Sequence, residues 1–299
     1  MGDFVGASIL ITGGAGFIGS HIADRLIEDE GVKRVYLLDN LVRGSLQNVE
    51  NAMKSGKVEF VKGDIRDRDL VDNLVSKVNY CFHMAALRIT HCDESPLDAF
   101  GVMYEGTYNL VEACSAYGIQ KLIAASSASI YGMARSFPTT EDHSPYANKT
   151  LYGAAKAANE LMYRAFNNLK GLSYVALRFF NVYGPRMDTT GKYTEVLVRW
   201  YYAIKRGEPP LIFGDGKQTM DFVFVQDVVR ATILAAKSEI TDEVLNIGSQ
   251  QETSLHELCH AMLRVTGSGL KPKFVDIPKE RNKVEVLRRL ADTTKAREF

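Results

Sequence analysis

Short apolar runs alternate with longer amphipathic stretches along the first 180 residues of the chain. The apolar runs predict buried strands at residues 8–12, 34–39, 58–62, 79–83, 121–125 and 173–178. The amphipathic stretches predict helices at residues 17–29, 68–76, 97–117 and 151–168. Strands that alternate with helices build a parallel sheet with both faces covered. The pattern therefore predicts an α/β fold with a doubly wound parallel sheet.

This regular alternation ends near residue 181, where glycine, proline and charged residues interrupt the apolar runs. Residues 222–225 and 244–247 have the apolar character of strands that return to the sheet, and residues 254–266 predict a helix. We therefore expect a main domain of residues 1–180 with returning segments near 221–247. Residues 181–220 and 248–299 would form a smaller, discontinuous lobe.

The composition narrows the class of protein. Lysine plus arginine and aspartate plus glutamate each number 36 among the 299 residues, so the formal net charge is zero. Nucleic-acid-binding proteins usually carry a basic excess, and this chain has none. A hydrophobic content of 46% and a charged content of 24% are typical of an ordinary globular protein. We expect no nucleic-acid partner.

Neither the N-terminal residues nor the cysteines indicate an extracellular or membrane protein. The apolar segment 9–22 is interrupted by glycines, lacks a basic start and is too short to span a bilayer. No two cysteines have the close spacing of a metal or redox motif; they are Cys81, Cys92, Cys114 and Cys259. We expect reduced thiols, no bound metal, no membrane partner and a cytoplasmic location.

A glycine-rich turn directly follows the first predicted strand. Gly13, Gly16 and Gly19 give the spacing G-x-x-G-x-x-G between this strand and a helix. Glycines here permit a tight turn, the approach of a pyrophosphate to the backbone, and close packing of helix on sheet. The helix N-terminus presents free N–H groups and a positive dipole end to the phosphates. Because a second strand ending in an acidic residue follows, the turn predicts dinucleotide binding in a Rossmann fold.

That acidic residue, Asp39, favours one of the two nicotinamide dinucleotides. Its carboxylate can accept hydrogen bonds from both ribose hydroxyls of NAD and would repel the additional phosphate of NADP. Arg43 lies near enough in the sequence to weaken the repulsion, but NAD remains favoured. Asp64 and Ile65 follow the third predicted strand, where they would meet the adenine; the alternative role of Asp64 is to cap a helix.

Tyr152 and Lys156 form the pattern Tyr-x-x-x-Lys on a predicted helix, where residues four apart share a face. A tyrosine titrates near pH ~10 in water, so a lysine cation and a positive nicotinamide must favour its anion. Ser126, Ser127 and Ser129 stand upstream, at the end of the fifth predicted strand. Because the carboxyl ends of parallel strands face the ligand crevice, we expect a serine hydroxyl there to bind the reacting oxygen. Turn formation is the alternative role of these serines.

The same spacing occurs at Tyr117 and Lys121 and again at Tyr201 and Lys205. The first pair spans the end of a helix and the start of a strand, and the second lies in an aromatic helical stretch. Neither pair is preceded by a strand that ends in serines. We therefore place the catalytic tyrosine at Tyr152.

A series of longer motifs occurs in order along nearly the whole chain. They are Thr-Gly-Gly-Ala-Gly-Phe-Ile-Gly, Leu-Asp-Asn-Leu, Gly-Asp-Ile-Arg-Asp, His-Met-Ala-Ala, Ser-Ser-Ala-Ser-Ile-Tyr-Gly, Tyr-Gly-Ala-Ala-Lys, Arg-Phe-Phe-Asn-Val-Tyr-Gly-Pro-Arg and Ala-Asp-Thr-Thr-Lys-Ala. As a set, they resemble the NAD-dependent epimerase/dehydratase branch of the extended short-chain dehydrogenase/reductase family, and within it the UDP-sugar 4-epimerases. The resemblance implies an NAD-dependent isomerase that acts on a nucleotide sugar.

The resemblance also assigns roles to the matching positions. Ser127, Tyr152 and Lys156 would be the catalytic residues. The cofactor site would contain Gly13, Gly16, Phe17, Ile18, Asp39, Asn40, Leu41, Gly44, Asp64, Ile65, Met84, Ala85, Ala86, Arg88, Tyr152, Lys156 and Phe179. The substrate site would contain Ser127, Ser129, Asn181, Val196, Leu211, Ile212, Phe213 and Arg281. The long helices at 97–117 and 151–168 would pack against those of a second subunit in a homodimer.

The chain departs from the family's pattern at several positions. Met220 stands where the family has an arginine that binds the substrate diphosphate, and Met103 stands where it has an asparagine near the cofactor. Arg289 occupies a position that is often a small residue or a tyrosine and limits sugar size; it would meet an acidic or unusual sugar, or point to solvent. The chain stops at Phe299, where relatives continue for about another helix. The identity of the sugar and of the nucleotide therefore stays open.

Several reactions are compatible with these catalytic residues. A 4-epimerase needs only hydride transfer at C4 and one acid–base residue. A 4,6-dehydratase must also expel water, and relatives use an acidic pair at the positions of Ala128 and Ser129; decarboxylases have a glutamate at that of Ser129. The sequence therefore favours C4 inversion of a UDP-hexose over the dehydratase, decarboxylase and reductase alternatives. A non-catalytic NAD-binding protein would not need the tuned tyrosine.

Overall fold

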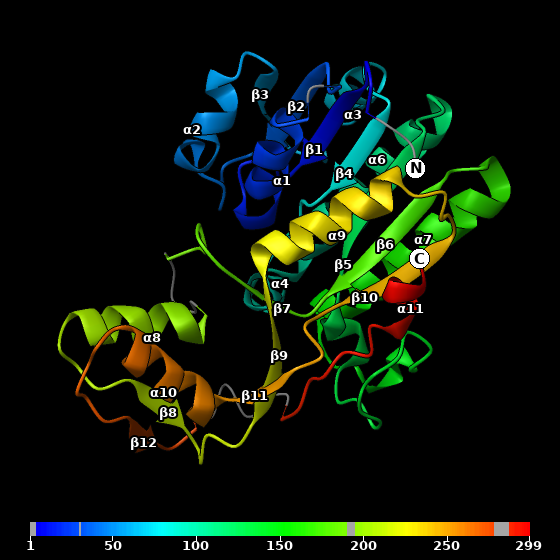
Figure 1. Cartoon of the computed structure of the whole chain (residues 1–299). Helices are drawn as coiled ribbons and strands as arrows, with labels where there is room; N and C mark the ends of the chain where they lie inside the picture. The colour runs from blue at the N-terminus through cyan, green and yellow to red at the C-terminus, as the bar shows by residue number, and fades with distance from the viewer. Residues whose placement is uncertain (1–3, 30, 190–194, 278–286) are drawn as a thin grey trace.

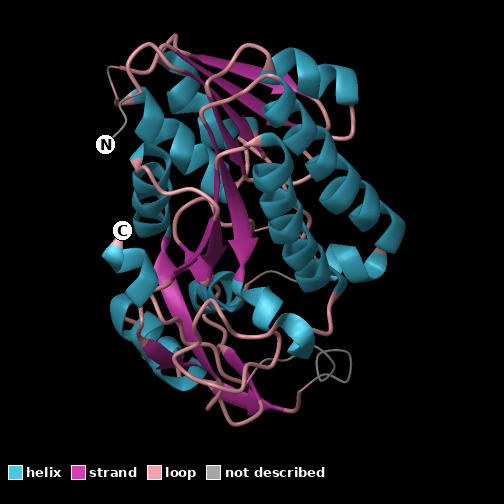
Figure 2. Cartoon of the chain, turned by 90° about the vertical axis from the view of Figure 1, so that its right-hand side faces the viewer, coloured by secondary structure: helices cyan, strands magenta, loops and turns pink. Residues whose placement is uncertain are grey.

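The computed structural model describes residues 4–29, 31–189, 195–277 and 287–299. A seven-stranded parallel sheet forms its centre, with strand order β10-β6-β5-β4-β1-β2-β3. The strands are β1 (Ser8–Thr12), β2 (Arg34–Asp39), β3 (Val58–Lys62), β4 (Tyr80–His83), β5 (Lys121–Ser127), β6 (Tyr174–Phe179) and β10 (Glu243–Ile247). Helices lie on both sides of the sheet (Figure 1, Figure 2). The doubly wound α/β fold expected from the sequence is confirmed.

Local sequence sets the ends of the covering helices. Thr150 caps α7 (Leu151–Lys170) by accepting a hydrogen bond from Gly153 N, and Gly171 ends this helix at φ +73°. Glycine is favoured at such left-handed C-caps. The other helical segments around the sheet are α1 (Phe17–Ile27), α2 (Leu46–Lys54), α3 (Arg68–Val75), α4 (Ile89–Glu94), α5 (Pro96–Phe100), α6 (Gly106–Ala116), η2 (Ala128–Tyr131), η3 (Pro145–Ala147), α9 (Val225–Lys237) and α11 (Thr294–Glu298).

The helix predicted at residues 97–117 contains a π-helical turn. The helix α5 continues into η1 (Gly101–Glu105), which is π-helical, and then into α6. Within η1, Met103 is buried, and its Sδ accepts a hydrogen bond from Leu87 N at 3.3 Å. The thioether therefore supports the loop that follows β4.

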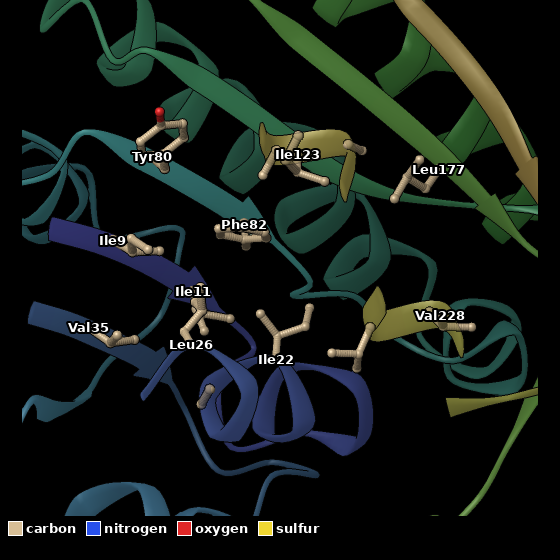
Figure 3. Close-up of a cluster of buried hydrophobic side chains, with 14 of the residues drawn as sticks. Ile9, Ile11, Ile22, Leu26, Val35, Tyr80, Phe82, Ile123, Leu177 and Val228 are labelled. Carbon is tan, nitrogen blue, oxygen red and sulfur yellow. The ribbon is translucent and has the colours of Figure 1, made fainter. Parts of the chain in front are cut away.

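Two apolar cores fill the spaces between the sheet and its helices. On one face, side chains of the central strands meet Ile22 and Leu26 of α1 and Val228 of α9 (Figure 3). On the other face, Leu10 of β1 belongs to a second cluster with Leu110 of α6. All five side chains are buried. Burial on both faces holds the strands in place and thereby fixes the positions of their carboxyl ends.

A smaller lobe lies beyond the carboxyl ends of the main strands, at the lower left of Figure 1. Its elements are β7 (Asn181–Tyr183), α8 (Val196–Lys205), β8 (Leu211–Phe213), β9 (Thr219–Phe224), β11 (Glu252–Ser254), α10 (Leu255–Val265) and β12 (Lys273–Val275). The strand β9 pairs with β7 and β11, and β8 pairs with β12. Within the described residues, no helix combines the length and the apolar character needed to cross a bilayer.

The expected return of residues 222–225 to the main sheet is wrong, whereas residues 244–247 do return to it as part of β10. The buried carboxylate of Asp221 explains the placement of β9. It accepts hydrogen bonds from Ser249 N at 2.6 Å, Gln250 N at 3.0 Å and Ala291 N at 3.1 Å. These contacts hold β9 among segments of the smaller lobe.

Candidate active site

The glycine turn joins β1 to α1 in a conformation that other residues could not adopt without strain. Gly13 has φ +67°, and a Cβ there would lie 2.8 Å from Ala85 N on the loop after β4. A Cβ on Gly19 would collide with Gly13 O, because α1 packs directly against the turn. Gly16 is the N-cap of α1, and no side chain caps this end. The N-terminal N–H groups of α1 are therefore open to an anionic ligand.

Asp39 lies next to this turn, at the carboxyl end of β2. Its carboxylate accepts hydrogen bonds from Ala15 N at 3.0 Å and Leu41 N at 2.8 Å. Burial raises the pKa of Asp39, while the two backbone hydrogen bonds and the charge of Arg43 oppose this shift. A carboxylate has about four lone-pair positions, so two remain for ribose hydroxyls. A Cβ on Gly44 would lie 2.6 Å from Asp39 Oδ1, so a larger residue there would displace this carboxylate.

A single cavity of about 1570 Å³ extends from the glycine turn into the smaller lobe. Pockets for one small ligand measure roughly 300–1,000 Å³, so this cavity has room for a dinucleotide and a second ligand. The cofactor residues expected from the sequence line it, with the exception of Leu41: Gly13, Gly16, Phe17, Ile18, Asp39, Asn40, Gly44, Asp64, Ile65, Met84, Ala85, Ala86, Arg88, Tyr152, Lys156 and Phe179. Leu41 instead packs against the apolar core.

Asp64 does not cap the helix that follows it, because Asp67 is the N-cap of α3. Its carboxylate instead accepts hydrogen bonds from Asn40 Nδ2 at 3.0 Å and from the Arg66 guanidinium at 2.9 Å. These contacts, with that of Arg66 first, lower the pKa of Asp64 to about 2. Asp64 is therefore a fixed anion on the cavity wall.

The expected substrate residues divide into two groups. Ser127, Ser129, Asn181 and Val196 line the cavity, whereas the residues of β8 do not. In β8, Ile212 is buried in the core of the smaller lobe. The remaining expected residue, Arg281, lies outside the described residues. The structure thus brings only part of the expected substrate set to the cavity.

Ser127, Tyr152 and Lys156 meet at the carboxyl end of β5. Ser127 is the last residue of β5, and its Oγ accepts a hydrogen bond from Ser129 N at 3.1 Å. Tyr152 and Lys156 occupy the first two turns of α7, with Lys156 Nζ 5.8 Å from the centre of the Tyr152 ring. Lys156 Nζ also donates a hydrogen bond to Ala125 O at 2.5 Å. The three side chains form one wall of the cavity.

Burial shifts these titrating groups toward their neutral forms. It lowers the pKa of Lys156 to about 8, although Glu160 opposes the shift. It raises the pKa of Tyr152, while a hydrogen bond with Ser127 and the charge of Arg289 act in the opposite direction. The neutral phenol is therefore favoured in the protein alone, and a bound cation beside it would favour the phenolate.

A buried ion pair supports this wall from behind. Arg178 of β6 binds Glu160 of α7 through two hydrogen bonds, of 2.9 and 2.6 Å, and Ser126 Oγ donates to the same carboxylate. Arg178 Nη1 also donates to Tyr131 OH at 2.8 Å, in the segment that follows Ser127. This pair was not predicted from the sequence. An arginine within an apolar strand was the available signal.

Asp188 is a second group that the sequence analysis missed. Its carboxylate lies 3.2 Å from Arg43 Nε and 3.0 Å from Arg88 Nη2, and all three residues line the cavity. An ion pair of 2.6 Å between Arg186 and Asp24 ties the same segment to α1. The segment after β7 therefore connects the smaller lobe to the cofactor side of the cavity.

The other two Tyr-x-x-x-Lys matches lie away from the cavity. Tyr117 is 52% exposed at the end of α6, and Lys121 donates hydrogen bonds to the backbone carbonyls of Ala235 and Ser238. Tyr201 is 48% exposed on α8. The structure thus separates both pairs from Ser127.

The three residues that depart from the family's pattern, Met103, Met220 and Arg289, lie in different places. Met220 and Arg289 line the cavity, whereas Met103 does not. Arg289 N donates a hydrogen bond to Thr219 O at 3.0 Å, so Arg289 lies beside Met220 on the lobe side. Among the residues that the structure describes, no group of three or more His, Cys, Asp or Glu side chains is arranged to hold a metal ion.

Comparison with known proteins gives the same family as the sequence motifs. The chain matches the NAD dependent epimerase/dehydratase family over residues 9–248. It is 40% identical over 253 residues to a putative UDP-glucose 4-epimerase of Methanocaldococcus jannaschii, a match that covers 84% of this chain and 79% of that protein.

Two solved structures are similar over almost the whole chain. One is the UDP-N-acetylglucosamine 4-epimerase from Methanobrevibacter ruminantium M1 in complex with UDP-N-acetylmuramic acid, with a TM-score of 0.91, 33% identity and coverage of 99% of this chain and 91% of that one. The other is the UDP-glucuronic acid 4-epimerase from Bacillus cereus in complex with UDP-glucuronic acid and NAD, with a TM-score of 0.87, 27% identity and coverage of 97% and 92%. The match spans the glycine turn and α7, and the chain therefore belongs to the NAD-dependent epimerase/dehydratase family.

Proposed function

We propose that this protein is an NAD-dependent nucleotide-sugar 4-epimerase, which reversibly inverts C4 of a UDP-hexose through a 4-keto sugar. The observation that carries the proposal is the grouping of Ser127, Tyr152 and Lys156 on one wall of a cavity large enough for cofactor and substrate. The neighbouring positions hold Ala128 and Ser129, and neither residue can act as an acid or base near neutral pH. The wall thus provides one acid–base centre, which is what C4 inversion requires.

The cofactor half of the cavity fits NAD, which supplies the acceptor and donor of hydride when bound. The uncapped N-terminus of α1 suits the pyrophosphate, and the two open positions on the Asp39 carboxylate suit the ribose hydroxyls. Arg88 lies on the cavity wall where it would bind a phosphate. We propose that residues 1–180 with 225–247 bind NAD and that the smaller lobe, which includes β9, binds the sugar nucleotide.

In the proposed reaction, the Tyr152 phenolate takes the proton from the 4-hydroxyl of the sugar as hydride leaves C4. Ser127 would bind the same oxygen, since its hydroxyl stands at the carboxyl end of β5 beside the tyrosine. Lys156 would support the phenolate with its charge and bind the nicotinamide ribose. After the ketone has turned over, hydride returns to the other face of C4 and Tyr152 returns the proton.

The carboxylates of α4 offer a test of the alternatives. Asp93 and Glu94 line the cavity, but neither forms a hydrogen bond with Ser127, Tyr152 or Lys156. If either carboxylate served as the acid for water loss, the product would be lighter by one water. A 4-epimerase leaves the mass of the sugar unchanged.

The experiment is incubation of candidate UDP-sugars with the enzyme in deuterated water, followed by mass spectrometry. An epimerase gives a product of unchanged mass without carbon-bound deuterium, because the hydride leaves C4 and returns to it. Loss of water or carbon dioxide, or deuterium at C5, would refute C4 inversion and favour a dehydratase or decarboxylase.

We further propose that the protein forms a homodimer through α5 and α7. Leu97 of α5 is 88% exposed and Leu161 of α7 is 69% exposed, and Phe100 and Leu169 add exposed apolar area on the same two helices. Burial of such side chains stabilises association. Light scattering at micromolar concentration should give the mass of a dimer, and Leu161→Glu should give that of a monomer. A wild-type monomer would refute this proposal.

A further inference from the structure

Two histidines lie one turn apart on α10, in the smaller lobe (Figure 1). His256 and His260 are four residues apart, so their side chains project from the same face of the helix. His256 is exposed and His260 is partly exposed, and neither lines the cavity of the candidate active site. The pair is therefore open to solvent and separate from the site described above.

The two imidazole rings bring one nitrogen each to the same place. His256 Nε2 and His260 Nε2 are 3.2 Å apart, and the ring centres are 4.4 Å apart with the ring planes inclined at 61°. At most one proton can lie between the two nitrogens, because a neutral imidazole has one N–H and one acceptor nitrogen. A metal ion can take the place of that proton, since a neutral imidazole nitrogen is the commonest metal ligand in proteins.

The distance between the two nitrogens suits a metal ion. Imidazole binds zinc at about 2.0–2.1 Å, so two nitrogens 3.2 Å apart would subtend an angle of about 100° at the ion. This angle lies between the roughly 90° of square-planar and the roughly 109° of tetrahedral coordination. The spacing of the two nitrogens is therefore already that of a metal-bound pair.

Neighbouring contacts hold His256 in this position. Its backbone N donates a hydrogen bond to Gly216 O at 3.0 Å. Its ring stacks on that of Phe274 in β12, with the ring centres 6.3 Å apart and the planes inclined at 21°. Ser254 and Glu257 form a capping box that fixes the first turn of α10. A ligand that is held in place before the ion binds loses less conformational entropy on binding.

Residues 256–260 read His-Glu-Leu-Cys-His, which matches the H-E-x-x-H pattern of zinc peptidases. In those enzymes the glutamate is a general base, and a third protein group binds the zinc. Here Glu257 Oε2 accepts hydrogen bonds from Ser254 N at 2.8 Å and Ser254 Oγ at 2.7 Å, and Cys259 is buried in the core of the lobe. Within the described part of the chain, no Cys, Asp, Glu or further His completes a group of three with the pair. The arrangement fits the binding of an ion and not the hydrolysis of a peptide.

We propose that His256 and His260 form a binding site for one divalent transition-metal ion, with water in the remaining coordination positions. Imidazole ligands favour copper, nickel and zinc, whereas magnesium and calcium prefer oxygen ligands. Cu²⁺ should bind more tightly than Ni²⁺ or Zn²⁺, as the general order of affinities predicts. The bound ion would link two successive turns of α10, the helix whose first residue, Leu255, lines the cavity. An ion that binds only the folded helix stabilises the smaller lobe.

The experiment measures metal binding by the untagged, NAD-loaded protein, using isothermal titration with nickel chloride in a buffer that does not bind metal. The four cysteines are buried, so they do not compete for the ion in the folded protein. We expect one ion per chain. Loss even of an outer contact to a metal ligand weakens binding by about 10- to 100-fold, so His256→Gln and His260→Gln should each weaken it by at least about 10-fold.

His143→Gln is the matched control, because both nitrogens of this ring already have partners. His143 Nε2 accepts a hydrogen bond from Arg135 N at 3.0 Å, and Nδ1 lies 2.9 Å from Ser144 O. This variant should bind Ni²⁺ as tightly as the wild type. Turnover without added metal should be the same in wild type and in both α10 variants, since neither histidine lines the cavity. Unchanged turnover shows that the variants are folded.

Electron paramagnetic resonance of the Cu²⁺-loaded protein identifies the ligands directly. The wild type should show coupling to two imidazole nitrogens, and each of the two α10 variants should show coupling to one. A wild-type spectrum without two imidazole nitrogens would overturn the inference, even if a variant fails to fold. A nickel affinity that neither His256→Gln nor His260→Gln lowers, or that His143→Gln abolishes, would overturn it as well. These outcomes are independent of C4 inversion, because they concern metal binding alone.

Discussion

The two halves of the cavity differ in how they satisfy charge. On the wall formed by the main sheet, Asp39 is bound by two backbone N–H groups, and Glu160 behind the wall is bound by Arg178. On the wall formed by the smaller lobe, Arg289 has no partner among the described residues, and Met220 stands where the family has a cation. The cofactor half is thus organised by contacts within the protein, whereas Arg289 in the other half makes no such side-chain contact with the described residues. A family that keeps one cofactor and varies the sugar is expected to show this difference.

The strongest test of the organised half is Tyr152→Phe. Loss of the phenolic hydroxyl removes the acid–base group, and turnover should fall by roughly 10²–10⁴ while NAD stays bound. Rates of C4 inversion and the NAD content of the purified protein would measure this. Tyr117→Phe and Tyr201→Phe have the same Tyr-x-x-x-Lys spacing outside the cavity and should remain active. An inactive Tyr201→Phe with an active Tyr152→Phe would show that the site has been placed wrongly.

Glu160→Gln tests whether pairing behind the catalytic wall matters for stability. The change leaves the buried Arg178 guanidinium without a counter-charge, and breaking a buried pair in this way costs about 3–5 kcal/mol of unfolding free energy. Urea denaturation of the NAD-loaded protein would measure it. The exposed pair of Arg25 and Glu28 provides the control, and Arg25→Gln should unfold at the wild-type urea concentration. Equal behaviour of the two variants would show that burial of the Arg178–Glu160 pair does not add to its effect on stability.

Asp39→Ser tests whether the negative charge of Asp39 makes the protein bind NAD in preference to NADP. The variant loses hydrogen bonds from a carboxylate to the ribose and the repulsion of a 2′-phosphate. We expect NAD affinity to fall by about 10-fold or more and the ratio of NADP to NAD binding to rise. Fluorescence titration with the reduced cofactors would measure both. An unchanged ratio would contradict the role of Asp39, as would a wild-type protein that purifies with NADP.

The last test concerns the pH dependence of stability that Lys156 causes in the NAD-free protein. Its pKa is about 8 in the folded state and near 10.5 for an unperturbed lysine. Between these values the unfolded chain binds more protons, so the contribution of Lys156 to the unfolding free energy rises with pH. Lys156→Met should therefore be more stable than wild type at pH 7, with an advantage that shrinks toward pH 10. Urea denaturation at both pH values would show it, with Lys205→Met on the exposed face of α8 as the control.

The parts of the molecule that the sequence predicted depend on local pattern. The strands of the main sheet follow from short apolar runs, and the glycine turn follows from spacing within eight residues. Asp188 could not be found in this way, because its partner Arg43 lies 145 residues earlier in the chain. Ile212 was expected near the substrate, yet long-range packing within the smaller lobe buries it. The orientation of Arg289 depends likewise on its pairing with Thr219.

The π-helical turn in η1 joins two helical segments with different surroundings. Leu97 and Phe100 before the turn are exposed, whereas Leu110 and Val111 after it are buried in the core. A π-turn holds one additional residue, which rotates the two helical faces by about 100° relative to each other. Deleting one residue from η1 would therefore rotate α5 relative to α6 and bring Leu97 and Phe100 against different parts of the protein. The number of residues in η1 therefore determines which face of α5 is exposed to solvent.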